Sequence, residues 1–172
     1  MTGTKQKNGF TLVETVVATF VFSVVVIASQ GVFGKALMVI KSGAAAQRVQ
    51  ESVQYALELM ARDIRVSGIS ADQEDATCTL SQLTLVHPVL GMVIYRHDST
   101  AVERTVDGLS GHITADDVLI NSLSFCVRHA GFDGEQTRVT ILLDAIYNSE
   151  KASEQKELRV QTTVSLRDYE TE

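Results

Sequence analysis

The stretch Phe10–Gly34, FTLVETVVATFVFSVVVIASQGVFG, decides the fold, because it is apolar or uncharged throughout except for one carboxylate, Glu14. Its 25 residues correspond to about 37 Å of α-helix at 1.5 Å per residue. That length crosses a hydrocarbon core about 30 Å thick, so we expect a transmembrane helix over residues 10–34. A carboxylate in such a span costs about 2–4 kcal/mol, which predicts a function for Glu14.

Charge is distributed unevenly along the chain. Of the 15 basic and 21 acidic residues, Lys5, Lys7 and Glu14 precede Lys35, which leaves 13 basic and 20 acidic residues and a net charge of −7 in residues 35–172. The positive-inside rule places the lysine-containing N-terminus in the cytoplasm, so the C-terminal domain is expected outside the cytoplasm. The acidic domain lacks the basic stripe typical of nucleic-acid binding, and the composition gives no direct evidence for such a partner.

Residues 35–67 continue the helical pattern, but with one apolar face. Apolar residues recur there mostly at steps of three and four, at Leu37, Ile40, Ala44, Val49, Val53, Ala56, Leu57, Met60 and Ile64. No proline interrupts residues 10–67, so the sequence predicts one continuous helix, half transmembrane and half amphipathic. Gly31 and Gly34 are the expected weak points, where the helix can bend or melt locally. Gly68 is predicted to end the helix as a left-handed cap.

Beyond the helix the apolar period changes from 3.6 to 2, which indicates half-buried strands in the region 78–168. The expected strands are CTLSQLTLV (78–86), MVIYRH (92–97), AVERTV (101–106), DVLINSLSFCVRH (117–129), RVTILLDAIY (138–147) and KELRVQTTVSLR (156–167). HAGFDGEQ (129–136) is predicted to be a hairpin connection. A sheet with one apolar face and an amphipathic helix each need a cover, so we expect an α+β fold in which the helix packs on an antiparallel sheet.

Cys78 and Cys126 both lie in the domain expected outside the cytoplasm. A disulfide between them would close a loop of about 48 residues and stabilise the fold by ~4 kcal/mol on the loop-entropy model. The alternative is two buried thiols, each behaving as a small apolar side chain. No CxxC or Cys/His spacing predicts a zinc site.

The segment KNGFTLVE, residues 7–14, followed by the apolar run, resembles the class III signal of type IV pilins and pseudopilins. The resemblance implies a leader of residues 1–9, cleavage by prepilin peptidase between Gly9 and Phe10, and N-methylation of the new Phe10 amine. It also implies an assembly role for Glu14, whose carboxylate would pair with that amine in its own first turn or on an adjacent subunit. The alternative is a Glu14 side chain that snorkels to the lipid headgroups.

Two further segments narrow the resemblance. ALELMARDIRVSG (56–68) and VQTTVSLR (160–167) resemble the minor pilins and pseudopilins of the PilW and PulJ type. Many pilins carry a proline about twenty residues into the mature helix, whereas this chain has Gly31 near that point. The implied parts of the chain are a leader (1–9), a transmembrane helix (10–34) and an extracytoplasmic pilin-like domain (35–172) with its own helix (35–67).

The leading hypothesis is a structural subunit, not an enzyme, of a type IV pilus, a type II secretion pseudopilus or a DNA-uptake filament. Its partners would be prepilin peptidase, the assembly platform protein, and other major and minor pilins or pseudopilins. It would cross the bacterial inner membrane once and pass into the filament on assembly. A rival hypothesis is an ordinary secretory signal cleaved after Val26-Ile27-Ala28, which leaves a soluble binding domain. A second rival is a membrane-anchored enzyme or receptor with a pilin-like anchor.

Other polar clusters give weaker indications of a site. Asp116-Asp117 and Asp133-Gly134-Glu135 offer oxygen ligands for calcium, although without EF-hand spacing, and solvated turns are the alternative. No catalytic motif surrounds any of the four histidines, His87, His97, His112 and His129. Arg62-Asp63-Ile64-Arg65 is a candidate docking patch for a partner subunit, with an ordinary Glu58–Arg62 helix pair as the alternative.

Overall fold

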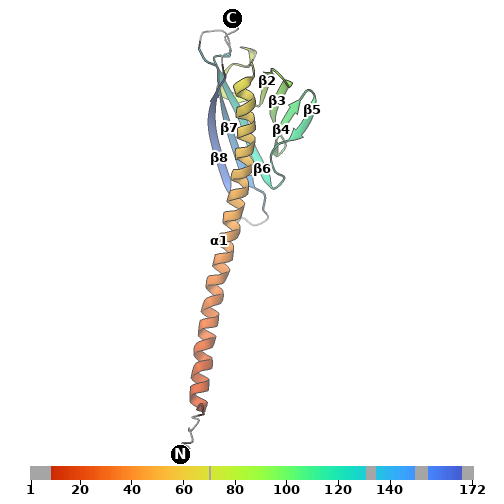
Figure 1. Cartoon of the computed structure of the whole chain (residues 1–172). Coiled ribbons are helices and arrows are strands. Elements are labelled where there is room, and N and C mark those ends of the chain that lie inside the picture. The colour runs from red at the N-terminus through yellow and green to blue at the C-terminus, as the bar shows by residue number, and fades with distance from the viewer. Residues whose placement is uncertain (1–8, 70, 131–134, 150–154, 168–172) are drawn as a thin grey trace, which may run out of the picture. The chain divides into compact units, whose positions relative to one another are not determined.

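The computed structural model of the chain (Figure 1) describes residues 9–69, 71–130, 135–149 and 155–167. The chain divides into two compact units, Met1–Lys41 and Ser42–Glu172. The long helix α1 (Leu12–Val66) contributes to both units, and every strand belongs to the second. The predicted α+β fold, with a long N-terminal apolar helix and antiparallel strands, is confirmed.

Helix α1 runs for 55 residues without a break. Gly31 and Gly34 both lie inside it, so the helix does not melt at these positions, and a bend there stays a prediction. A single glycine costs only about 1 kcal/mol relative to alanine, which a long helix tolerates. The predicted left-handed cap at Gly68 is also wrong, since Gly68 forms an antiparallel bridge with Val86 instead. The chain passes from the last helical turn directly into that β-bridge.

The first sheet contains the longest strands and has the order β1-β6-β7-β8, antiparallel throughout. Its strands are β1 (Asp75–Leu80), β6 (Val118–Arg128), β7 (Arg138–Tyr147) and β8 (Glu157–Ser165). A bulge in β6 lies between Ile120 and Ser122, opposite consecutive residues of β7. Because a bulge adds one residue, the buried positions of β6 change from even to odd numbers there, and the strand keeps one apolar face.

The second sheet is a four-stranded meander, β2-β3-β4-β5. Its strands are β2 (Gln82–His87), β3 (Gly91–Asp98), β4 (Ala101–Val106) and β5 (Leu109–His112). The sequence predicted one sheet, and this second sheet is a correction. The segment predicted as a single strand over 78–86 divides at Ser81 into β1 and β2, which pair in different sheets. Asp107 and Gly108, both with positive φ, form the two-residue turn between β4 and β5.

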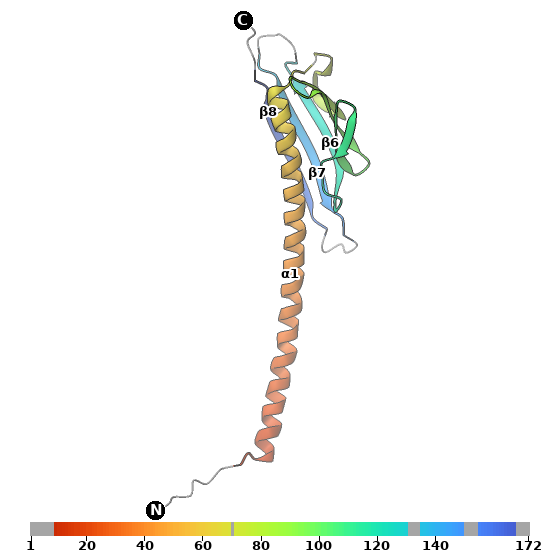
Figure 2. The same cartoon turned by 45° about the vertical axis from the view of Figure 1, so that its right-hand side comes forward.

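The C-terminal part of α1 supplies one wall of the hydrophobic core. Its fully buried side chains follow steps of three and four, at Val49, Val53, Ala56, Met60 and Ile64. They belong to one core cluster with Phe125 and Ile141 of the first sheet and with Leu83 and Val93 of the second. Figures 1 and 2 both show this part of α1 lying across β7 and β8. One helical stripe therefore covers apolar faces of both sheets.

We expect Met60→Ala to lower the free energy of unfolding of residues 35–172 by ~2–5 kcal/mol, because a fully buried side chain is lost and a cavity remains. The measurement is a urea melt at constant m value. Met92→Ala is the matched control, since the same truncation at a methionine that is 56% exposed should cost much less. Equal, small losses for both variants would contradict the assignment of α1 as the core wall.

Candidate functional site

The residues predicted to be processed lie at the N-terminal end of α1. Gly9 and Phe10 precede the helix, which begins at Leu12, and the Phe10 side chain is 84% exposed. A Cβ built on Gly9 would meet no atom within 4 Å among the described residues other than its chain neighbours. The fold of the chain itself therefore places no demand for glycine at this position. A requirement for Gly9 would have to come from another molecule, such as a peptidase.

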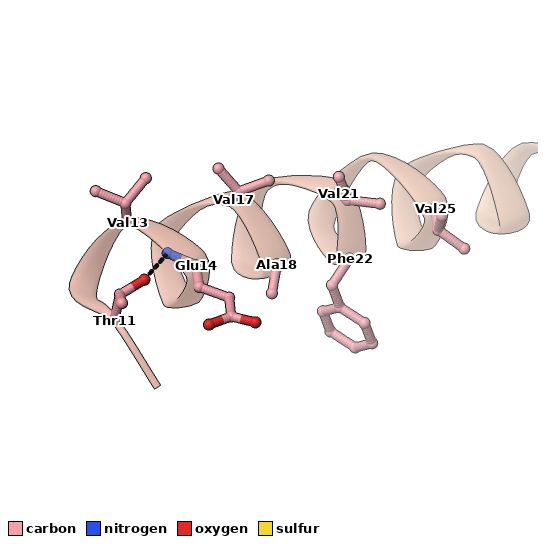
Figure 3. Close-up of a pocket in the computed structure, with 8 residues that line it drawn as sticks. All are labelled: Thr11, Val13, Glu14, Val17, Ala18, Val21, Phe22 and Val25. Atoms are coloured by element: carbon pink, nitrogen blue, oxygen red, sulfur yellow. Dashed lines mark hydrogen bonds between the residues drawn. The ribbon is translucent and has the colours of Figure 1, made fainter. Parts of the chain in front are cut away.

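Thr11 caps this end of the helix. Its Oγ1 accepts a hydrogen bond from the backbone N–H of Glu14, at 3.2 Å, as Figure 3 shows. This is the geometry of an N-cap residue bonded to the third helical residue, and Thr-x-x-Glu is the capping-box spacing. No role was predicted for Thr11, although the Thr-x-x-Glu spacing in the sequence could have identified the cap. The Glu14 carboxylate points away from Thr11, toward the side on which Ala18 and Phe22 lie.

Glu14 is the one charged side chain on an otherwise apolar helix face. The face is open rather than an enclosed cavity, and it is formed by Thr11, Val13, Glu14, Val17, Ala18, Val21, Phe22 and Val25. Within the described part of the chain, no basic side chain pairs with Glu14. A carboxylate at such a surface carries a high desolvation cost unless a cation from elsewhere approaches it. The geometry thus leaves Glu14 available to a partner charge.

The hydroxyl groups in the same segment are satisfied within the helix. Thr15, Thr19, Ser23 and Ser29 each donate to the carbonyl four residues earlier, at distances from 2.7 to 3.3 Å. Hydroxyls bonded in this way carry little desolvation cost in lipid. By length and composition α1 can cross a membrane, although no membrane is present in the structure. Unlike these hydroxyls, the Glu14 carboxylate is charged, so it would carry a high desolvation cost in lipid.

Comparison with known proteins supports this interpretation of the N-terminus. Residues 4–29 match the family model of the prokaryotic N-terminal methylation motif. The match covers the predicted leader end, Gly9, Phe10 and Glu14. It indicates a type IV pilin-type precursor that is processed by prepilin peptidase, with membrane anchoring through the N-terminal helix. No curated protein and no solved structure matches the chain.

A buried polar cluster joins α1 to the second sheet. The Asp63 carboxylate accepts a hydrogen bond from the Tyr95 hydroxyl at 2.6 Å and pairs with the Arg104 guanidinium at 2.8 Å. Asp63 is 3% exposed and Tyr95 is fully buried. Burial, followed by the hydrogen bond and charge of Asp63, raises the pKa of Tyr95 well above its usual value. Burial by itself would lower the pKa of Arg104, but its contacts with Asp63 and Tyr95 outweigh burial and raise it.

The predicted docking patch Arg62-Asp63-Ile64-Arg65 is therefore not one continuous surface. Asp63 and Ile64 face the core, and only the two arginines remain partly or fully exposed. The helical period places successive residues on different sides, so four adjacent residues cannot share one face. The function of Asp63 is to fix the helix against β3 and β4. Its partners, Tyr95 and Arg104, could not be predicted from local sequence because they lie 32 and 41 residues away in the chain.

Cys78 and Cys126 form a disulfide in the structure. It joins a bulge of β1 to β6, where Asp75 and Leu80 lie opposite Val127 and Phe125. The Asp75 carboxylate organises this bulge by accepting hydrogen bonds from the backbone N–H groups of Thr77, Thr79 and Leu80. The Thr77 hydroxyl, followed by the backbone N–H groups of Thr77 and Thr79, holds the pKa of Asp75 well below its usual range. The bulge is thus fixed by a covalent bond and by a carboxylate.

Several of the remaining candidate residues have partners within the domain. Asp117 pairs with Arg48 of α1 at 3.0 Å, and the segment 131–134, with Asp133 and Gly134, lies outside the described residues. In the part of the chain that the structure describes, no three His, Cys, Asp or Glu residues are grouped as metal ligands. His97 Nε2 lies 2.8 Å from the carbonyl of Ile120, and His112 pairs with Asp98. His87 accepts backbone N–H groups at a turn, and His129 pairs with Glu135.

We expect Asp63→Ala to lower the free energy of unfolding by ~3–5 kcal/mol, because it leaves the partly buried Arg104 charge and the buried Tyr95 hydroxyl without their shared acceptor. Glu58→Ala, an exposed acidic position on the same helix, is the matched control and should cost little. Urea melts of residues 35–172 measure both. If the two variants lose equal stability, the cluster does not hold the second sheet on α1.

We expect replacement of both Cys78 and Cys126 by serine to lower the free energy of unfolding by ~4 kcal/mol, because a loop closed over a sequence separation of 48 is released in the unfolded state. The wild-type protein in reductant should unfold at the urea concentration of the double variant. Thiol titration and non-reducing mass mapping of oxidised protein provide an independent measurement. Two free thiols in that material would contradict the bond.

Proposed function

We propose that the chain is a minor pilin or pseudopilin, a structural subunit of a type IV pilus or a type II secretion pseudopilus. The observation that carries the proposal is the matched N-terminal motif at residues 4–29 on a 55-residue helix whose first part exposes its apolar side chains. An apolar helix of this kind can lie in lipid before assembly and against other subunits afterwards. Membrane residence and filament assembly thus use the same surface.

The proposed topology places the short basic N-terminus in the cytoplasm and residues 35–172 outside it, across the bacterial inner membrane. The disulfide Cys78–Cys126 supports an oxidising compartment for that domain. Prepilin peptidase would cut between Gly9 and Phe10 and methylate Phe10. The assembly platform protein and other pilins or pseudopilins are the proposed later partners. We propose no cofactor and no calcium ion for this assembly role.

The proposed role of Glu14 is to accept the charge of the Phe10 amine during docking of a subunit. The exposed, unpaired carboxylate in the described structure supports this role, since a cation at the same depth would offset the desolvation of both groups. A minor rather than major subunit is supported by the resemblance of residues 56–68 and 160–167 to the PilW and PulJ type.

We expect Glu14→Val to keep the protein in the membrane, because it raises the hydrophobicity of the span, and to abolish most of its incorporation into the filament. Leader cleavage should be largely spared. Glu14→Asp keeps the charge but is shorter by one methylene, so incorporation should be intermediate. Co-purification with partner pilins, at equal abundance of each variant, is the measurement. The proposal is falsified if Glu14→Val is incorporated at the wild-type level.

Gly9→Val is the control for processing, because a side chain at the residue before the cut should obstruct the peptidase. Intact mass should show residues 1–9 retained in this variant and removed in Glu14→Val. The mature wild-type N-terminus should be Phe10 carrying a methyl group. A mature chain beginning at Ser29 would instead favour an ordinary secretory signal.

A further inference from the structure

The start of α1 is placed by one side chain close to the proposed cleavage site. Thr11 Oγ1 accepts the backbone N–H of Glu14 at 3.2 Å, and the Thr11 carbonyl accepts the backbone N–H of Thr15 at 3.2 Å. Thr11 is therefore the residue at which helical hydrogen bonding begins. Gly9 and Phe10, on either side of the proposed cut, lie outside the helix. The helix start at Thr11 thus falls one residue after the proposed scissile bond.

That boundary affects the chemistry of cleavage. In hydrolysis, water adds to the Gly9 carbonyl carbon and the bond to the Phe10 nitrogen breaks, which leaves a carboxylate on Gly9 and an amine on Phe10. Inside an α-helix the same carbonyl is bonded to an N–H four residues later, and the following turn restricts access to it. An N-cap residue has non-helical backbone angles, so a cap at Thr11 stops the helix before it reaches the Gly9–Phe10 bond.

The sequence contains a second candidate cap three residues earlier. Asn8, outside the described residues, is of a type strongly preferred at helix N-termini. A helix capped by Asn8 would begin at Gly9 and would include the scissile bond in its first turn. The strength of the cap at Thr11 decides between these two starts.

We propose that Thr11 is a positioning residue for processing, whose hydroxyl caps α1 and keeps the Gly9–Phe10 bond in extended, accessible chain. This inference rests on the proposed function, because it assumes that prepilin peptidase cuts this bond. Thr11 acts on the reaction through the position of the helix start and not through contact with the reacting atoms. Its hydroxyl, rather than its size, is the property that matters.

The experiment measures the rate at which purified prepilin peptidase removes residues 1–9 from the full chain in lipid vesicles, followed by intact mass. Thr11→Val keeps the side-chain shape and loses the acceptor, so cleavage should slow by about five-fold, the factor expected for loss of a typical cap. Thr11→Ser keeps the acceptor and should restore a rate close to that of the wild type. Thr19→Val is the matched control, since Thr19 bonds only within the helix and should leave the rate unchanged.

A double variant tests the competing helix start. Asn8→Ala combined with Thr11→Val should be cleaved faster than Thr11→Val alone, whereas a general loss of stability would not be rescued in this way. Circular dichroism of each variant in the same vesicles checks that the helix is retained. Cleavage of Thr11→Val at the wild-type rate overturns the inference, as does a Thr11→Ser rate as low as that of Thr11→Val. Absence of any cut at Gly9–Phe10 in the wild type overturns the proposed function instead.

Discussion

The contact between one stripe of α1 and two sheets is the constraint on which the rest of the structure depends. Val53, Ala56, Met60 and Ile64 are fully buried and belong to one core with residues of both sheets. Each sheet has an apolar face to bury, and the helix stripe is part of the one core cluster that buries residues of both. The Asp63 carboxylate makes this contact specific, since it can accept hydrogen bonds from Tyr95 of β3 and Arg104 of β4 only in one alignment of the helix.

Polar contacts and a disulfide stabilise two edge strands of the sheets, β2 and β1. The outer edge of β2 is covered by the bridge from Gly68 to Val86 and by the Gln73 side chain, which bonds both backbone groups of Thr84. A covered edge cannot pair with a strand of another molecule. The edge strand of the first sheet, β1, carries the disulfide of Cys78 and the bulge organised by Asp75. These contacts suit the proposed function, in which the chain associates with other subunits through its helix.

The first part of α1 exposes its apolar side chains, whereas the later part buries them, and the proposed function explains this difference. Residues before Lys41 expose apolar side chains such as Phe20, Phe22 and Phe33. Within that apolar surface, we propose that one carboxylate, Glu14, serves assembly and that one capping hydroxyl, Thr11, serves processing. The later part of α1 buries one stripe in its own domain. A soluble domain can thus be carried on a helix that is available to other subunits.

The sequence by itself determined the helix, the strands and the processing signal, because each depends on residues close together in the chain. The period of 3.6 in residues 35–67, the period of 2 in KELRVQTTVSLR and the string KNGFTLVE are all local patterns. Only the tertiary structure decided the division into two sheets, since Ser81 carries no pattern that separates β1 from β2. It also decided the role of Asp63, which looks like a surface residue in sequence but meets Tyr95 and Arg104 through distant pairing. Local patterns fix which elements form, whereas burial of one helix stripe against distant strands fixes how they meet.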